Sequence, residues 1–149
     1  MMNISDILNE KTVLVDVDAE NKRQLIKKLA DTVSASSDLD ASLVFEALLE
    51  RENLGSTGYG KGVAFPHARI EGIKTVIAVF ARLNKALDFE SVDGKSVDLV
   101  ACLISPENSG EDHLQMLSAF SRVLENDEVC KRIRKSKSAH EIYVELTTN

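Results

Sequence analysis

The sequence lacks several features that would place it in a specialised class of protein. It has no tryptophan, only two prolines and two cysteines, and aromatic residues make up 5% of its 149 residues. No apolar run approaches the roughly 20 residues that a membrane-spanning helix needs. Residues 1–10 also lack the basic and apolar regions of a signal peptide. We therefore expect a protein of the cytoplasm with no membrane insertion.

Positive charge and cysteine motifs are scarce as well. The net charge is -6, and nucleic-acid binding needs clustered cations that neutralise phosphates, so no nucleic-acid partner is expected. The basic run KRIRKSK, residues 131–137, predicts a solvated helix end, with contact to an acidic partner as the alternative. Cys102 and Cys130 lack the spacing of a metal or redox motif, which predicts buried thiols in a reducing compartment.

What the chain does contain is a regular succession of helical patterns. An amphipathic period recurs in several segments, with Asp18 and Asp40 as expected caps and Ser138 opening the last helix in a capping box with Glu141. Gly55 is expected to close one helix in the left-handed conformation. We expect helices over residues 4–8, 19–33, 41–53 and 111–124, and two shorter helices after residue 126. Their apolar faces are expected to include Leu43 and Leu114.

Strand patterns alternate with these helices. TVLVDVD, residues 12–18, alternates apolar and acidic residues as a half-buried strand does. VAFPH, KTVIAVFARL and VDLVACLIS are nearly continuous apolar runs, typical of strands covered on both faces, and Asp93-Gly94 predicts a hairpin turn. The chain, with 44% hydrophobic residues, is therefore expected to form a single α/β domain over residues 1–149, with a mixed β-sheet flanked by helices.

The stretch GSTGYGKG, residues 55–62, holds four of the seven glycines and nearly matches the nucleotide-binding P-loop pattern. Gly62 stands where that pattern has Ser or Thr. A P-loop also leaves a strand and opens a helix, whereas here a helical segment precedes the glycines and Val63, Phe65 and Pro66 follow. Nucleotide binding is therefore not expected. A plain turn between helix and strand, or a nest of backbone amides for an anion, remains open.

The three histidines are the main candidates for chemistry. A neutral imidazole is a nucleophile near neutral pH and can carry a phosphoryl group on nitrogen. His67 follows Pro66, and His113 lies near the start of a helix, so one could accept a phosphoryl group while the other donates a hydrogen bond to it. A structural role stays open for each of them, and His140 is expected at the surface.

A metal site and an arginine complete the candidates. His67 and His113 with Glu111 or Asp112 would offer nitrogen and oxygen ligands, but no metal-binding spacing supports this, so no metal is expected. Arg51 lies at a predicted helix end, four residues before Gly55. It is either a solvated cation that complements the helix dipole or a guanidinium directed at a phosphoryl oxygen or a partner.

The segment ALLERENLGSTGYGKGVAFPHARI, residues 47–70, resembles the enzyme IIA domains of the fructose–mannitol class in the bacterial phosphotransferase system. Within that class the sequence is most similar to the nitrogen-regulatory branch. The likeness continues through SDILNEKTVLVDVDAENKRQLIKKLA, DFESVDGKSVDLVACLISP, HLQMLSAFSRVL and VCKRIRKSKSAHEIYVEL, and so covers nearly the whole chain.

This resemblance implies a phosphotransferase in which His67 accepts a phosphoryl group from a histidine phosphocarrier protein. It also implies that His113 is the second active-site histidine and that Arg51 lies near the site. Such a transfer needs no ATP, metal or organic cofactor. We expect the hydroxyls of Ser56 and Thr57, with backbone amides of residues 55–62, to add hydrogen-bond donors for the phosphoryl group.

The sequence departs from the commonest family pattern at three positions. Phe65 and Ala68 are interpreted as packing variants, and Lys61 as a cation beside the site that alters the choice of partner. Three functions stay open. The protein regulates target proteins through its phosphorylation state, or passes the phosphoryl group to a cysteine of a sugar-specific enzyme IIB, or binds partners without turning over phosphate.

Overall fold

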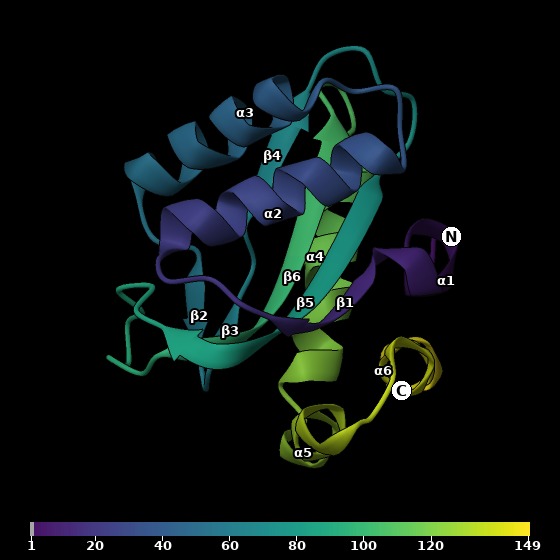
Figure 1. Cartoon of the computed structure of the whole chain (residues 1–149). Coiled ribbons are helices and arrows are strands. Elements are labelled where there is room, and N and C mark those ends of the chain that lie inside the picture. The colour runs from purple at the N-terminus through teal and green to yellow at the C-terminus, as the bar shows by residue number, and fades with distance from the viewer. Residues whose placement is uncertain (1) are drawn as a thin grey trace.

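The fold is built on a mixed sheet whose central strand is β6. The computed structural model describes residues 2–149, and its strands run in the order β1-β5-β6-β3-β2, with β4 also paired to β6 (Figure 1). β5 and β6 are antiparallel, whereas β3 and β4 both lie parallel to β6. The expected α/β class with a mixed sheet is confirmed. The elements are α1 Ile4–Ile7, a 3-10 turn Glu10–Thr12, β1 Val13–Val17, α2 Lys22–Ala35, α3 Ala41–Leu54, β2 Gly58–Gly60, β3 Val63–Ala64, β4 His67–Ile70, β5 Ile77–Leu87, β6 Val97–Pro106, α4 Gly110–Leu124, α5 Asp127–Lys135 and α6 Ala139–Thr148.

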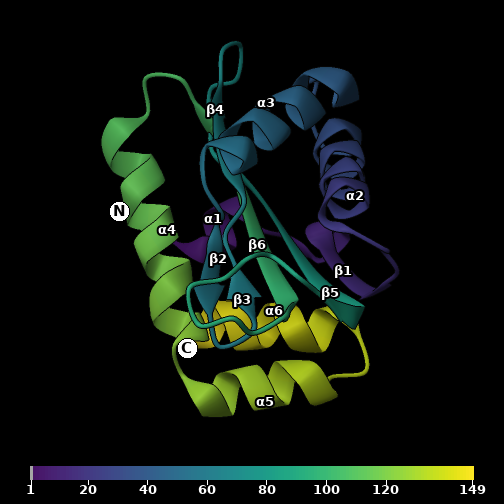
Figure 2. The same ribbon diagram turned by 90° about the vertical axis from the view of Figure 1, so that its left-hand side faces the viewer.

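Helices cover both faces of this sheet, which explains the continuous apolar strands. α2 and α3 lie on one face, and α4 crosses the other, with α5 and α6 below it (Figures 1 and 2). Successive residues of β5 therefore enter different cores: Ala78 and Phe80 pack with α4, α5 and α6, whereas Val79 and Ala81 pack with α2 and α3. This three-layer arrangement places the end of β6 directly beneath the start of α4.

The helix caps agree with the sequence in two of three cases. Asp40 accepts a hydrogen bond from the Ser42 amide, and Ser138 accepts one from the Glu141 amide, as expected. The Glu141 carboxylate accepts from the Lys137 amide and not from the Ser138 amide, so only half of the predicted capping box forms. The prediction of Asp18 as the N-cap of α2 is wrong, because the Asn21 side chain, and not Asp18, accepts a hydrogen bond from the Gln24 amide at 2.9 Å. The Asp18 carboxylate instead accepts a hydrogen bond from the Asn84 side chain, which ties β1 to β5.

Two further expectations about local conformation are wrong, and a third is confirmed. Gly55 closes α3 with φ 164°, which is extended backbone and not left-handed. Leu43 and Leu114 are 51% and 63% exposed, because α3 and α4 bury narrower stripes than the apolar spacing suggested. The hairpin turn predicted at Asp93-Gly94 is confirmed: the Gly94 amide donates to the Ser91 carbonyl in the loop that joins the antiparallel strands β5 and β6.

The glycine run, residues 55–62, contributes to the β2–β3 hairpin, and this geometry explains its glycines. β2 and β3 are antiparallel, and the turn between them needs positive φ at both Lys61 (58°) and Gly62 (82°). Gly58 is required for a different reason: a Cβ there would lie 2.3 Å from the Ser91 hydroxyl. The run therefore serves strand geometry, in agreement with the rejection of a P-loop.

The described part of the chain, residues 2–149, has no helix that is both long and apolar enough to cross a membrane. Cys102 and Cys130 are both buried free thiols, as predicted. Burial raises the pKa of Cys102 to about 12, so this thiol stays protonated and unreactive.

Candidate active site

A break in one strand positions His67. β3 and β4 lie one after the other along β6, and the pairing is interrupted at Phe65 and Pro66. Pro66 has no N–H to give to a sheet, although its carbonyl still accepts from the Leu103 amide at 3.0 Å. His67 is the first residue after this break, and its side chain is only partly buried.

The backbone at the break also fixes the tautomer of His67. Its Nδ1 lies 2.8 Å from the Phe65 carbonyl oxygen, which can only accept, so Nδ1 carries the proton. Burial is the main cause that lowers the pKa of His67, and the positive charge of Arg51 lowers it further. The hydrogen bond to the Phe65 carbonyl raises this pKa, but the net effect is a lowering. His67 is therefore neutral at pH 7, and the lone pair on Nε2 is free to act as a nucleophile.

His113 lies beside this ring, as the sequence proposed. It projects from the first turn of α4, is 3% exposed, and its ring centroid is 5.2 Å from that of His67. Its Nδ1 lies 2.5 Å from the hydroxyl of Ser105 at the end of β6. Burial, together with the positive charges of protonated His67 and of Arg69, lowers the pKa of His113 to about 4. The second histidine is thus also neutral and can give one N–H.

Two hollows open on either side of His67, and Arg51 borders both. One, of about 510 Å³, also contains His113 and Arg69, with the exposed Leu54 and Leu114 at its rim. The other, of about 380 Å³, is lined largely by hydroxyl-bearing side chains: Ser56, Thr57, Tyr59, Ser118 and Ser121. The Arg51 guanidinium is held over the loop by a 2.8 Å hydrogen bond to the Gly55 carbonyl. Arg51 and the two histidines therefore line the same hollow.

Ser56 and Thr57 border the site, but their hydroxyl protons are used elsewhere. The Thr57 hydroxyl donates to Glu52 at 2.5 Å, and the Ser56 hydroxyl donates to the Phe89 carbonyl. The backbone amides of Gly55, Thr57, Gly58 and Lys61 also donate to other protein groups. This loop is held rigidly, with few donors left to offer to an anion.

Three residues of the site escaped the sequence analysis. Glu52 is buried and accepts hydrogen bonds from both the amide and the hydroxyl of Thr57. It also forms a salt bridge with Lys22 of α2 at 3.0 Å, so it anchors the loop that contains Thr57 to α2. Arg69 places a second cation on the hollow of the two histidines, and Ser105 supports His113. The alternation of β4 puts Arg69 two residues after His67 on the same face, which was a usable signal. Ser105 carried no such signal, because it meets His113 only through tertiary packing.

Other residues singled out in the sequence lie outside the two hollows. Lys61 is at the tip of the β2–β3 hairpin, and its Nζ lies 3.7 Å from Asp127, so it is not a cation beside His67. His140 is exposed at the surface, as expected, and faces Glu10. The basic run pairs with the protein's own acids, with Arg134 on Asp98 and Arg132 on Glu145, as a solvated helix end does.

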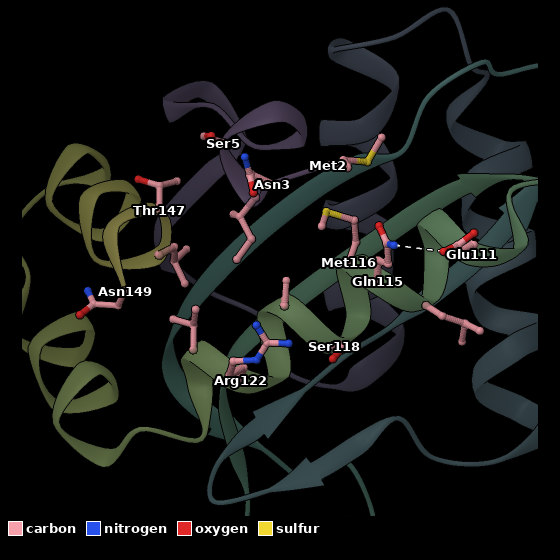
Figure 3. A pocket seen from close by; sticks show the side chains of 15 residues that line it. Met2, Asn3, Ser5, Glu111, Gln115, Met116, Ser118, Arg122, Thr147 and Asn149 are labelled. Carbon is pink, nitrogen blue, oxygen red and sulfur yellow. Dashed lines mark hydrogen bonds between the residues drawn. The ribbon is translucent and has the colours of Figure 1, made fainter.

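A third hollow contains no histidine. It encloses about 840 Å³ between residues 2–5, α4 and the end of α6, and Figure 3 shows Met2, Met116, Gln115 and Arg122 among its labelled side chains. Glu111 and Gln115 bond to each other there at 3.4 Å. Within residues 2–149, no group of three or more His, Cys, Asp and Glu side chains is arranged to hold a metal ion.

Fold and site together define an α/β protein in which a neutral histidine with a bare Nε2 lies beside a second neutral histidine. The family model described as "Phosphoenolpyruvate-dependent sugar phosphotransferase system, EIIA 2" matches residues 6–148, so the chain belongs to this family of phosphotransferase-system IIA proteins. The family resemblance drawn from the sequence is thereby confirmed.

Three known proteins are similar to this chain over most of its length. The chain is 38% identical over 142 residues to a nitrogen regulatory protein of Bradyrhizobium diazoefficiens, with 95% of this chain and 93% of that protein covered. It is 36% identical over 119 residues to a fructose-specific EIIA component of Haloferax volcanii, covering 80% and 76% of the two chains. The crystal structure of nitrogen regulatory protein IIA-Ntr from Neisseria meningitidis superposes with a TM-score of 0.92 at 34% identity, over 97% of this chain and 99% of that one.

Proposed function

We propose that this protein is a cytoplasmic phosphohistidine relay of a nitrogen-regulatory phosphotransferase system. His67 accepts a phosphoryl group from a histidine phosphocarrier protein, and the phosphorylation state of His67 regulates partner proteins. The observation that carries the proposal is the pair of neutral imidazoles 5.2 Å apart, with Nδ1 of His67 bonded to the Phe65 carbonyl and Nε2 free.

The transfer step follows from this tautomer. The lone pair of His67 Nε2 forms a new N–P bond as the N–P bond of the carrier's phosphohistidine breaks, and the electron pair of the broken bond returns to the carrier's histidine. Nδ1 keeps its proton throughout. Its hydrogen bond to the Phe65 carbonyl stabilises the positive charge that the ring gains while the new bond forms.

The groups around His67 position the phosphoryl group and neutralise its charge. The transition state of phosphoryl transfer is loose, with negative charge spread over three oxygens, so positioned donors and cations do most of the work. In our proposal His113 donates one hydrogen bond, and Arg51 supplies charge from the rim of both hollows. Ser56 and Thr57 contribute the wall of the site, because their hydroxyls already donate to other acceptors.

Phosphorylation of His67 would change what this face of the molecule can bind. A phosphoryl group adds about 1.5 to 2 negative charges. It would do so beside Arg51 and Arg69 and next to the exposed apolar rim of Leu54 and Leu114. An acidic partner that binds the free protein should then be released, which gives the phosphorylation state a regulatory output. The similarity to nitrogen regulatory proteins over nearly the full chain favours this role.

A second function is favoured by the similarity to a fructose-specific EIIA component. In that case the phosphoryl group passes from His67 to a cysteine of a sugar-specific enzyme IIB. Loss of the phosphoryl group from this protein on addition of a purified enzyme IIB, with labelled enzyme IIB appearing, would support the sugar role over the regulatory one.

The proposal is tested by intact mass after incubation with phosphoenolpyruvate, enzyme I and the matching phosphocarrier. Wild type should gain one acid-labile phosphoryl group, His67→Ala none, and His113→Ala should gain it more slowly. His140→Ala is the matched control, since it removes an exposed histidine outside the site. If wild type gains nothing while the carrier itself is phosphorylated, the protein is a binding module and the proposal is wrong.

A further inference from the structure

Ser105 is a fully buried serine whose hydroxyl has a specific partner. It lies at the end of β6, 0% exposed, where the sheet passes beneath the first turn of α4. Its hydroxyl oxygen is 2.5 Å from Nδ1 of His113. Among the hydrogen bonds of the described residues, 2–149, this is the bond that the Ser105 side chain makes.

The direction of this hydrogen bond can be inferred from what burial costs. If Nδ1–H donated to the serine oxygen, the serine proton would be left without an acceptor in a site closed to water, at a cost of about 1 to 3 kcal/mol. If the serine hydroxyl donates to Nδ1, one bond satisfies both the hydroxyl proton and the Nδ1 lone pair. The second arrangement is therefore favoured, and a neutral His113 then carries its proton on Nε2.

We infer that Ser105 is a positioning residue that holds His113 in the Nε2–H tautomer, so that His113 donates a hydrogen bond toward a phosphoryl group on His67. The two histidines thus have opposite tautomers, each set by an oxygen at Nδ1. The Phe65 carbonyl can only accept and leaves Nε2 of His67 bare, whereas the Ser105 hydroxyl donates and leaves Nε2 of His113 protonated.

This arrangement has a direct consequence for the transfer. A His113 with the proton on Nδ1 would present a lone pair to the phosphoryl oxygens and repel them. The tautomer itself is a property of the free protein, and only its effect on phosphoryl transfer rests on the proposed function.

The first experiment measures the tautomer without any phosphoryl transfer. Protein labelled with ¹⁵N-histidine is examined at pH 7 by two-bond ¹H–¹⁵N correlation, which separates protonated from unprotonated ring nitrogens. We expect an unprotonated Nδ1 and a protonated Nε2 for His113, and the reverse for His67. In Ser105→Ala the His113 nitrogens should shift toward an average of both tautomers. A protonated Nδ1 of His113 in wild type would overturn the inference, even if His67 accepts phosphate as proposed.

The second experiment measures the rate of phosphoryl transfer from the carrier at several carrier concentrations. Ser105→Ala should lower kcat roughly tenfold, as expected for one lost hydrogen bond to a charged group, with KM little changed. Ser105→Thr keeps the hydroxyl and should restore most of the rate. Ser91→Ala is the matched control: Ser91 is a buried serine whose side-chain hydroxyl has no hydrogen-bond partner in residues 2–149, so loss of this hydroxyl should leave the rate unchanged. Equal rates in Ser105→Ala and wild type would also overturn the inference, and if Ser105→Ala does not fold, the wild-type spectrum and Ser105→Thr still decide.

Discussion

At the scale of single residues, we propose that His67 and His113 have different roles because a different oxygen lies at Nδ1 of each ring. A carbonyl oxygen beside Nδ1 leaves Nε2 of His67 unprotonated, and in our proposal this nitrogen is the nucleophile. Burial first, and the positive charge of Arg51 in addition, lower the pKa of His67, so this lone pair stays unprotonated to a lower pH. Arg51 borders both hollows, and its charge helps to keep the pKa of His67 below its usual value.

Arg51→Gln should therefore raise the pKa of His67, because a positive charge that disfavours the imidazolium is lost. The same change should slow phosphoryl transfer about tenfold through loss of a charge-assisted contact. A titration of the His67 ring protons by NMR measures the first effect. Arg23→Gln is the control, since Arg23 lies on α2, over the ring of Phe45. An unchanged or lower His67 pKa in Arg51→Gln would contradict the assignment.

At the scale of elements, the β2–β3 hairpin and its approach to the β5–β6 loop hold the second hollow in shape. Gly58→Ala should destabilise the protein by about 2 kcal/mol, because the added Cβ would lie 2.3 Å from the Ser91 hydroxyl and 3.1 Å from its Cα. Ser91→Gly in the same chain should restore part of this loss. Urea unfolding followed by circular dichroism measures both.

Gly55→Ala is the matched control for this prediction. A Cβ at Gly55 meets nothing within 4 Å, and φ of 164° is open to any residue, so the free energy of unfolding should change little. If Gly55→Ala costs as much as Gly58→Ala, close packing against Ser91 is not what requires a glycine at position 58.

Local patterns were enough to predict most elements, and they failed where tertiary contacts decide. The caps Asp40 and Ser138 and the buried strands follow from short-range chemistry. Leu114 was expected in the core because its spacing fits an apolar stripe, yet α4 turns it toward the hollow of the two histidines. Ser105 could not be predicted at all, since its role depends on the register of β6 against β4 and on the place where α4 begins.

At the scale of the whole molecule, a buried neutral histidine couples stability to pH. The pKa of His113 is about 4 in the folded protein and about 6.5 when unfolded, so protonation favours the unfolded state. Its contribution is fully present above pH 6.5 and is lost as the pH falls toward 4. The loss amounts to about 3 kcal/mol, by the conversion of pKa shift into free energy.

Urea unfolding at pH 7 and pH 4.5 checks this coupling. Wild type should lose clearly more stability between the two pH values than His113→Gln, which has no group to protonate there. His67 contributes in the same direction in both proteins, because its pKa is lowered too, so the difference between the two losses reports on His113 and on its charge coupling to His67. Equal losses in the two proteins would show that His113 is not buried in neutral form.

The measurement that tests the central claim most directly is the chemical position of the phosphoryl group. Protein labelled with ¹⁵N-histidine and phosphorylated by its carrier should show a ³¹P–¹⁵N coupling to Nε2 of His67 and to no other ring nitrogen. This result is expected because Nδ1 is held by the Phe65 carbonyl while Nε2 opens into the hollows. A phosphoryl group on Nδ1 of His67, or on His113, would contradict the proposed division of labour between the two histidines.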